Sequence, residues 1–282
     1  MASVTATART GDGVELLTRH WPAVGLGRAN VLLVHGIGEH SGRYEHVGDG
    51  LASAGFDTHS YDQRGFGGSG GRRTWVDRWA TVHEDLEGRL AALRAVSDGR
   101  PVALYGHSLG GLIALGYALA ERPKPDLLVL SAPGLEDRLA GWKKVLARVL
   151  ARVAPGMRIA IGIDREKLAA QPIPTFRYGD DPLVETNGTA HFGALGLAEQ
   201  ARVRGLVDRL ERLPVPTLVV HGGDDQLVPL SATARLERFG DVTRIVYPGL
   251  RHETHNEAAS RTVADIVAWL GERIAVLEST HN

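Results

Sequence analysis

Short runs of aliphatic and β-branched residues alternate along the chain with longer segments of helical periodicity. The runs that are typical of buried strands lie at 31–34, 102–105, 127–130, 217–220 and 243–247. Most are continuously apolar, as in strands that a parallel sheet buries on both faces. Helical segments follow several of them, at about 43–54, 76–96, 109–121, 230–239 and 257–275. This alternation predicts an α/β fold with helices on both faces of a mostly parallel sheet.

The segment from Pro133 to about Leu213 breaks this alternation, because it holds helical pattern and loop but no convincing apolar strand. We expect it to be an insertion over the sheet. Within it, apolar residues recur at helical spacing over 142–153, and basic residues occupy another face of the same helix. The pattern favours a helix packed against its own protein, and it leaves open a basic amphipathic surface that meets lipid.

Composition and charge narrow the class of protein. Of the 282 residues, 43% are hydrophobic, which is enough for a large core, and 32 Lys and Arg against 33 Asp and Glu give a net charge of −1. This near-neutral balance argues against a nucleic-acid partner. The chain has 0 Cys, which excludes disulfides, thiolate metal sites and a cysteine nucleophile.

Two segments bear on localisation. Residues 1–10 lack the basic start and apolar run of a secretory signal, so we expect a cytoplasmic protein. The stretch 101–120 is uncharged over a bilayer length. Its proline, its histidine and its four glycines nevertheless favour a strand, a turn and a helix over a transmembrane span.

A candidate nucleophile lies in the stretch Gly106-His-Ser108-Leu-Gly110, a G-x-S-x-G motif. A buried strand runs directly into the motif and an uncharged helix runs out of it, which is the context of a nucleophile elbow. Such a turn is sharp and needs small residues two positions before and after the serine, where Gly106 and Gly110 stand. Ser108 is therefore the predicted nucleophile, and a glycine-rich turn without a catalytic function is the alternative.

A serine hydroxyl needs a base that takes its proton and an acid that orients the base. In this context the acid and the histidine follow the serine in chain order, at the ends of later strands. The predicted strand at 217–220 leads to Asp224 and Asp225, and the predicted strand at 243–247 leads to His252. We predict Asp225 as the acid, because it stands at the loop tip, and His252 as the base, because it directly follows a glycine loop. Asp224 is the alternative acid, and His255 is the alternative base. For His252 and His255 together, the further alternatives are two surface or capping histidines, or a two-histidine metal pair.

The oxyanion of such a reaction needs backbone N–H donors. Leu109, which follows the nucleophile at the helix start, supplies one, and the loop after the first apolar strand is placed to supply the other through Ile37. The alternatives for this loop are a tight turn without a catalytic function, and metal ligation by His35, Glu39 and His40.

The stretch 65–70 (GFGGSG) matches the dinucleotide-binding pattern G-x-G-x-x-G in form. That fingerprint must open a helix at once, whereas residues 71–74 intervene here. A glycine-rich loop near the site is the better interpretation.

Five motifs together resemble the α/β-hydrolases of the monoacylglycerol lipase and lysophospholipase group, which are serine aminopeptidase S33-type hydrolases. In the chain order of that group they are 35–44 (HGIGEHSGRY), 62–69 (DQRGFGGS), 106–110 (GHSLG), 221–225 (HGGDD) and 247–252 (YPGLRH). The resemblance covers about 31–257, which is nearly the whole chain. It implies that Ser108, Asp225 and His252 form the triad and that Ile37 and Leu109 bind the oxyanion.

The resemblance also implies an architecture. We expect a mostly parallel eight-stranded sheet in a core formed by residues 1–133 and 214–282, with an inserted helical cap at 134–213. The stretch 181–184 (DPLV) resembles a cap motif of the group. In the lipases of this group the cap is lipophilic, meets membranes and admits a single acyl chain.

The resulting hypothesis is a serine ester hydrolase that needs no cofactor and no metal. It would cleave a monoacylglycerol, or a similar single-chain lipid ester, through an acyl-enzyme. The alternatives that keep the triad are a short-chain carboxylesterase, a lysophospholipase, a peptidase or a lactonase. The non-enzyme alternative is an idle hydrolase-fold binding module, which an intact triad disfavours. The expected partner is the small lipid ester, with transient contact between the cap and a membrane surface as an open alternative.

Overall fold

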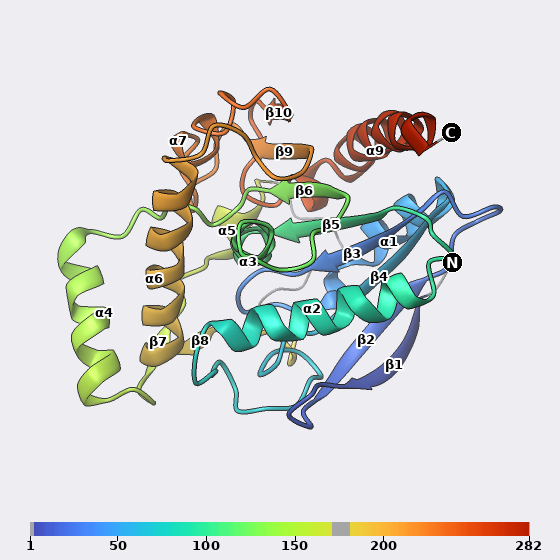
Figure 1. Cartoon of the computed structure of the whole chain (residues 1–282). Coiled ribbons are helices and arrows are strands. Elements are labelled where there is room, and N and C mark those ends of the chain that lie inside the picture. Colours follow the sequence, from blue (N-terminus) through green and yellow to red (C-terminus); the bar gives the residue numbers. More distant parts are fainter. Residues whose placement is uncertain (1–2, 171–180, 282) are drawn as a thin grey trace.

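The computed structural model describes residues 3–170 and 181–281. At its centre lies an eight-stranded sheet in which β2 pairs antiparallel with β1 and with β4, and the other pairings are parallel (Figure 1). In spatial order the strands are β1 (Val4–Arg9), β2 (Glu15–Trp21), β4 (Phe56–Tyr61), β3 (Ala29–Val34), β5 (Val102–His107), β6 (Leu127–Ser131), β9 (Thr217–Gly222) and β10 (Val242–Tyr247). The predicted mostly parallel eight-stranded sheet is confirmed.

Helices cover both faces of this sheet, as the sequence predicts (Figure 1). One face carries α2 (Ala80–Ala95), α3 (Leu109–Ala118) and α7 (Ser231–Ala234). The other face carries α1 (Glu45–Ser53) and α9 (Ala259–His281). Short helical turns at Ser41–Tyr44 and in α8 (Thr254–Glu257) complete this part of the fold. Because the sheet separates two apolar cores, every position of β3, β5 and β6 is buried and most of these positions are apolar, which explains their continuous runs.

Some elements differ from the sequence prediction. The pattern does not predict β1 and β2, because β1 is exposed and rich in threonine and β2 mixes polar with apolar residues. The helix expected at 230–239 ends at Ala234, after which the chain continues in short turns such as the one closed by Leu236 N–H and Thr233 O (3.0 Å). Runs of apolar residues therefore predict β10 at one edge of the sheet but not β1 and β2 at the other, where polar residues interrupt the pattern.

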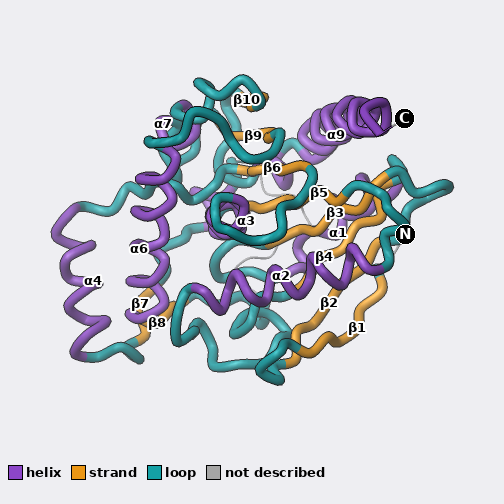
Figure 2. The backbone as a smooth tube through the Cα atoms, viewed as in Figure 1, coloured by secondary structure: helices purple, strands orange, loops and turns teal. Residues whose placement is uncertain are grey.

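The residues between β6 and β9 form a group of elements beside the sheet (Figure 2). These are α4 (Gly141–Val153), β7 (Arg158–Ala160), α5 (Arg165–Leu168), β8 (Asn187–Thr189) and α6 (Ala190–Val207). β7 and β8 pair in a small antiparallel sheet that the sequence does not predict, because each strand has only three residues. Residues 171–180 of the expected insertion lie outside the described residues.

The helix expected at 142–153 packs against its own protein, because α4 lies along α6, but its apolar residues do not enter the core. α4, all of which is described, buries none of its residues. It lies beside α6 (Figure 2), yet Trp142 and Val153 are 65% and 73% exposed, and Val145, Leu146 and Val149 are exposed with them. An apolar stripe on this helix therefore faces solvent.

The uncharged stretch 101–120 divides, as expected, into β5, a turn at Ser108 and α3. α3 has 10 residues, about half of what a bilayer requires. Within residues 3–170 and 181–281, no helix combines the length and the hydropathy needed to cross a membrane.

Candidate active site

Ser108 occupies the sharp turn between β5 and α3. Its backbone angles, φ 51° and ψ −114°, are strained for a residue that carries a side chain. The turn requires glycine on both sides, because a Cβ on Gly106 would overlap the carbonyl oxygen of Gly110, and a Cβ on Gly110 would overlap that of Val34. The half-buried serine is thereby presented at the carboxyl end of the parallel strands.

Asp225 and His252 meet at the same end of the sheet. Asp225 lies in the loop after β9, and His252 lies in the loop after β10. His252 Nδ1 is 2.7 Å from Asp225 Oδ2, and both side chains are buried. The ring of His252 also packs beside that of His107, the residue before Ser108, with centroids 4.9 Å apart. The structure thus brings the predicted acid and base together next to the turn that carries the predicted nucleophile.

Four donors hold the carboxylate of Asp225. Its Oδ1 accepts the N–H groups of Leu227 (2.7 Å) and Val228 (2.9 Å), and its Oδ2 faces His252 and His221 Nε2 (3.0 Å). Burial alone would raise the pKa of Asp225, but His252 and these hydrogen bonds outweigh burial and hold the pKa well below its usual value. Burial alone would lower the pKa of His252, but the neighbouring Asp225 outweighs it, so the pKa of His252 is raised. This environment keeps the acid ionised and makes the imidazole a stronger base.

The two alternative residues are placed differently. Asp224 is exposed, whereas Asp225 is buried. His255 stacks on Tyr44 with ring centroids 5.0 Å apart, and burial lowers the pKa of His255 well below its usual value. His252 and His255 are both buried, which contradicts the alternative that they are surface histidines.

The loop that follows β3 lies directly against Ser108. A Cβ on Gly36 would come 3.3 Å from the Cβ of Ser108, so the two backbones approach as closely as a glycine allows. Ile37 is the next residue of this loop, and Leu109 opens α3 on the other side of the serine. The two predicted oxyanion donors therefore belong to the two segments that meet at Ser108.

His35 and Glu39 fix the conformation of this loop. Glu39 Oε1 accepts the N–H of Gly36 (2.5 Å) and the hydroxyl of Tyr44 (2.6 Å). His35 Nε2 accepts the N–H of Gln63 (2.9 Å), so its Nδ1 carries the proton and donates to the carbonyl of Gly36 (2.8 Å). Since these contacts engage His35 and Glu39, they favour a positioning function over the alternative of metal ligation.

The glycine-rich loop at 65–70 supports the same region from outside. A Cβ on Gly67 would overlap Asp62 and would come 2.6 Å from the Cβ of His40. Asp62 Oδ1 accepts the N–H of Ser41 at 2.7 Å, immediately after the loop that carries Ile37. This packing agrees with the interpretation of 65–70 as a loop near the site.

Sequence reasoning missed a buried ion network behind the site. Arg43 bridges Glu39 (Nη1 to Oε2, 2.8 Å) and Glu253 (Nη2 to Oε1, 3.0 Å), and the three side chains are at most 6% exposed. Burial alone would raise the pKa of Glu39, but Arg43 outweighs it and lowers that pKa, whereas burial raises the pKa of Glu253. Because Glu253 directly follows His252, the network links the candidate base to the loop that Glu39 holds. The available signal was the spacing of Glu39 and Arg43, which are four residues apart in one motif.

The elements between β6 and β9 contact each segment of the site. His40 Nε2 lies 2.8 Å from Asp181 Oδ2, which belongs to the stretch 181–184. Three further hydrogen bonds join the two regions: Glu185 N–H to Gly38 O (2.8 Å), Glu253 N–H to Leu168 O (2.8 Å) and Arg138 Nη2 to Asp225 O (3.0 Å). Residues between β6 and β9 therefore lie against the loops that carry the candidate site.

Comparison with known proteins agrees with this geometry. The family described as serine aminopeptidase, S33, matches residues 27–259. The chain is 31% identical to the monoacylglycerol lipase of Mycolicibacterium smegmatis, over 92% of this chain and 93% of that protein. It is also 31% identical to the monoglyceride lipase of Homo sapiens, over 94% of this chain and 89% of that protein.

Solved structures give the same result. The crystal structure of the Paleococcus ferrophilus monoacylglycerol lipase is similar with a TM-score of 0.77 and 29% identity, over 97% of this chain and 100% of that one. A soluble variant of the Saccharomyces cerevisiae monoglyceride lipase, crystallised with a substrate analog, is similar with a TM-score of 0.86 and 23% identity, over 97% of this chain and 96% of that one. These similarities confirm the predicted α/β-hydrolase fold.

Proposed function

We propose that this chain, which belongs to the serine aminopeptidase S33 family of α/β-hydrolases, hydrolyses the ester bond of a monoacylglycerol or a similar single-chain lipid ester. The observation that carries this proposal is the buried contact of 2.7 Å between Asp225 and His252, beside the strained turn at Ser108. The lipases that are 31% identical over nearly the whole chain support the class of substrate.

In the proposed reaction, Ser108 Oγ attacks the ester carbonyl while His252 Nε2 takes the serine proton. Asp225 accepts a hydrogen bond from His252 Nδ1, which leaves Nε2 free to act as the base and stabilises the imidazolium that forms. His252 then gives the proton to the departing alcohol. A water molecule, deprotonated by His252, hydrolyses the acyl-enzyme and restores Ser108. No metal or cofactor is needed for these steps.

The oxyanion of the tetrahedral intermediate is bound by the N–H groups of Ile37 and Leu109. The N–H of Gly36 is directed to Glu39, so the next N–H of that loop serves the oxyanion instead. Leu109 contributes the first N–H of α3, where the helix dipole also favours a negative charge.

We place a substrate-selecting cap at residues 134–213, over a core formed by 1–133 and 214–282. The hydrogen bonds of this segment to Gly38, Asp225 and Glu253 support that position. The exposed apolar stripe of α4, with its exposed basic residues, supports transient contact of a cytoplasmic protein with a membrane surface.

Fatty-acid release from monooleoylglycerol by the purified chain tests the proposal, with hydrolysis of 4-nitrophenyl butyrate measured in parallel. We expect release from both esters, and a loss of roughly 10⁴-fold or more in Ser108→Ala. Cleavage of the short ester alone would move the substrate to the short-chain carboxylesterases. Activity that survives in Ser108→Ala would overturn the assignment of the nucleophile.

A further inference from the structure

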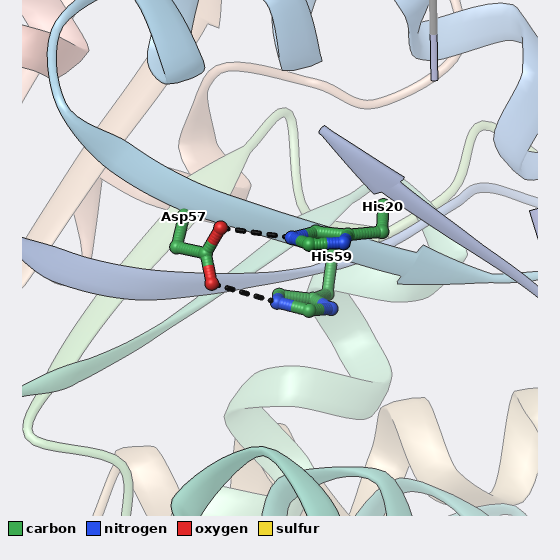
Figure 3. Close-up of side chains that lie close together, drawn as sticks. All are labelled: His20, Asp57 and His59. Atoms are coloured by element: carbon green, nitrogen blue, oxygen red, sulfur yellow. Dashed lines mark hydrogen bonds and ion pairs between the residues drawn. The ribbon is translucent and has the colours of Figure 1, made fainter. Parts of the chain in front are cut away.

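Two histidines and an aspartate converge on one face of the sheet where β2 and β4 pair (Figure 3). In the register of this antiparallel pair His20 lies opposite His59, and Asp57 stands two residues before His59 on the same strand. Side chains at positions i and i+2 of a strand, and those directly opposite on its neighbour, project from the same face. The sheet register itself therefore brings the three side chains together.

Both imidazoles present a nitrogen to the same carboxylate (Figure 3). His20 Nε2 lies 2.8 Å from Asp57 Oδ1, and His59 Nε2 lies 3.3 Å from Asp57 Oδ2. The two rings stack with centroids 4.1 Å apart and planes 10° apart, and one donor atom from each of the three side chains lies within 4.8 Å of the others. The N–H of Ala23, 3.2 Å from Asp57 Oδ1, helps to orient the carboxylate.

These distances are close to those of a metal site. Ligands bonded at about 2.0–2.1 Å to a tetrahedral Zn²⁺ are roughly 3.3 Å apart. The His59–Asp57 distance of 3.3 Å matches this value and the His20–Asp57 distance of 2.8 Å is shorter. The three donor atoms lie within 4.8 Å of one another, so binding of one ion would require the stacked rings to tilt toward a common point. The side chains of His20, Asp57 and His59 are 37%, 20% and 25% exposed, so an ion can enter and the rings can tilt.

We propose that His20, Asp57 and His59 form a binding site for a divalent transition-metal ion, with Zn²⁺ as the expected occupant. Two imidazole nitrogens and one carboxylate oxygen suit Zn²⁺, whereas Ca²⁺ and Mg²⁺ prefer oxygen ligands. Three protein ligands leave the fourth tetrahedral position to water. On binding, the ion takes the place of the protons that lie between the imidazoles and the carboxylate.

The site is separate from the candidate active site and does not depend on the proposed function. In the sheet register, Asn30 of β3 pairs with Asp57 on one side and with Val102, the first residue of β5, on the other. Asp57 is therefore level with the start of β5, whereas Ser108 follows the end of that strand. Six residues at about 3.3 Å each place the two sites roughly 20 Å apart along the strands. A bound ion would join β2 to β4, and so would hold the pair formed by β1 and β2 on the parallel part of the sheet.

Calorimetric titration of the metal-free full chain with ZnCl₂ tests the proposal. We expect one equivalent to bind with a micromolar Kd and to raise the melting temperature, because an ion that binds the folded chain stabilises it. His20→Gln and His59→Gln should each weaken the binding by at least about 100-fold, since even changes behind metal ligands cost 10- to 100-fold. Co²⁺ should give the visible absorption of a four-coordinate ion in the parent chain and not in either variant.

His191→Gln is the matched control, because His191 is a partly buried histidine whose Nε2 contacts the carbonyl of Val76 away from this site. It should bind Zn²⁺ as the parent chain does, and circular dichroism checks that each variant is folded. Binding that is absent below millimolar Zn²⁺, or that is the same in His20→Gln and His59→Gln as in the parent, would overturn the proposal. None of these readouts requires hydrolytic activity.

Discussion

Asp225→Asn changes the proposed triad without changing its shape. Oδ1 of Asp225 accepts the backbone N–H groups of Leu227 and Val228, at 2.7 Å and 2.9 Å, so the side-chain oxygen of an asparagine must stay there. Its amide NH₂ group then faces His252, where it can donate but cannot accept. His252 Nδ1 must become the acceptor, which puts the ring proton on Nε2, the atom that should take the proton of Ser108.

The size of the effect follows from this tautomer. We expect kcat to fall about 10⁴-fold, as the wrong histidine tautomer does in a Ser-His-Asp triad. That loss corresponds to about 5.5 kcal/mol of transition-state stabilisation. The asparagine keeps both backbone hydrogen bonds of the carboxylate that it replaces, but it loses the charged acceptor that faces His252 and His221, so the folded state should also lose some stability.

Steady-state hydrolysis of 4-nitrophenyl butyrate measures this loss, with circular dichroism as the check of the fold. Asp224→Asn is the matched control, because it makes the same chemical change one residue earlier, at an exposed carboxylate. We expect the control to keep the activity of the parent chain. A loss of less than about tenfold in Asp225→Asn, or an equal loss in Asp224→Asn, would refute the assigned function of Asp225.

Three further outcomes are expected. The raised pKa of His252 predicts that kcat/KM increases with pH as the imidazole loses its proton, with a midpoint above 6.5, the ordinary pKa of histidine; a midpoint at or below that value would contradict it. Arg43→Met leaves Glu39 and Glu253 buried without their cation, and should lower the free energy of unfolding, measured in urea, by about 3–5 kcal/mol. A loss below about 1 kcal/mol would mean that the network is not buried as described. Trp142→Glu should reduce sedimentation with anionic lipid vesicles while hydrolysis of a soluble ester is kept, and unchanged sedimentation would argue against a membrane contact at α4.

The parts of the fold that sequence could predict are those under the strongest local constraint. β3, β5 and β6 are buried at every position, so most of their residues must be apolar, with Asn30, His107 and Ser131 as the polar exceptions. The turn at Ser108 has a backbone conformation that requires glycine two positions before and two after it, and this requirement is visible in the sequence. The candidate acid and base could be chosen because chemistry restricts their residue types and the fold restricts their chain order.

The remaining features depend on contacts between distant segments. α4 has an amphipathic pattern, but the sequence does not say whether its apolar side meets the protein or the solvent, and the structure exposes it. The link from Arg43 to Glu253 joins residues 210 positions apart. The cluster of His20 with His59 exists only through the register of β2 and β4, and β2 lacks the apolar run that would have predicted it.

The central claim is that Ser108 is a nucleophile activated by His252. Reaction of the purified chain with a fluorophosphonate probe, followed by peptide mapping with mass spectrometry, tests it most directly. We expect one adduct, on Ser108, that is absent in Ser108→Ala and forms far more slowly in Asp225→Asn. An adduct on another residue, or labelling of undiminished rate in Ser108→Ala, would contradict the claim.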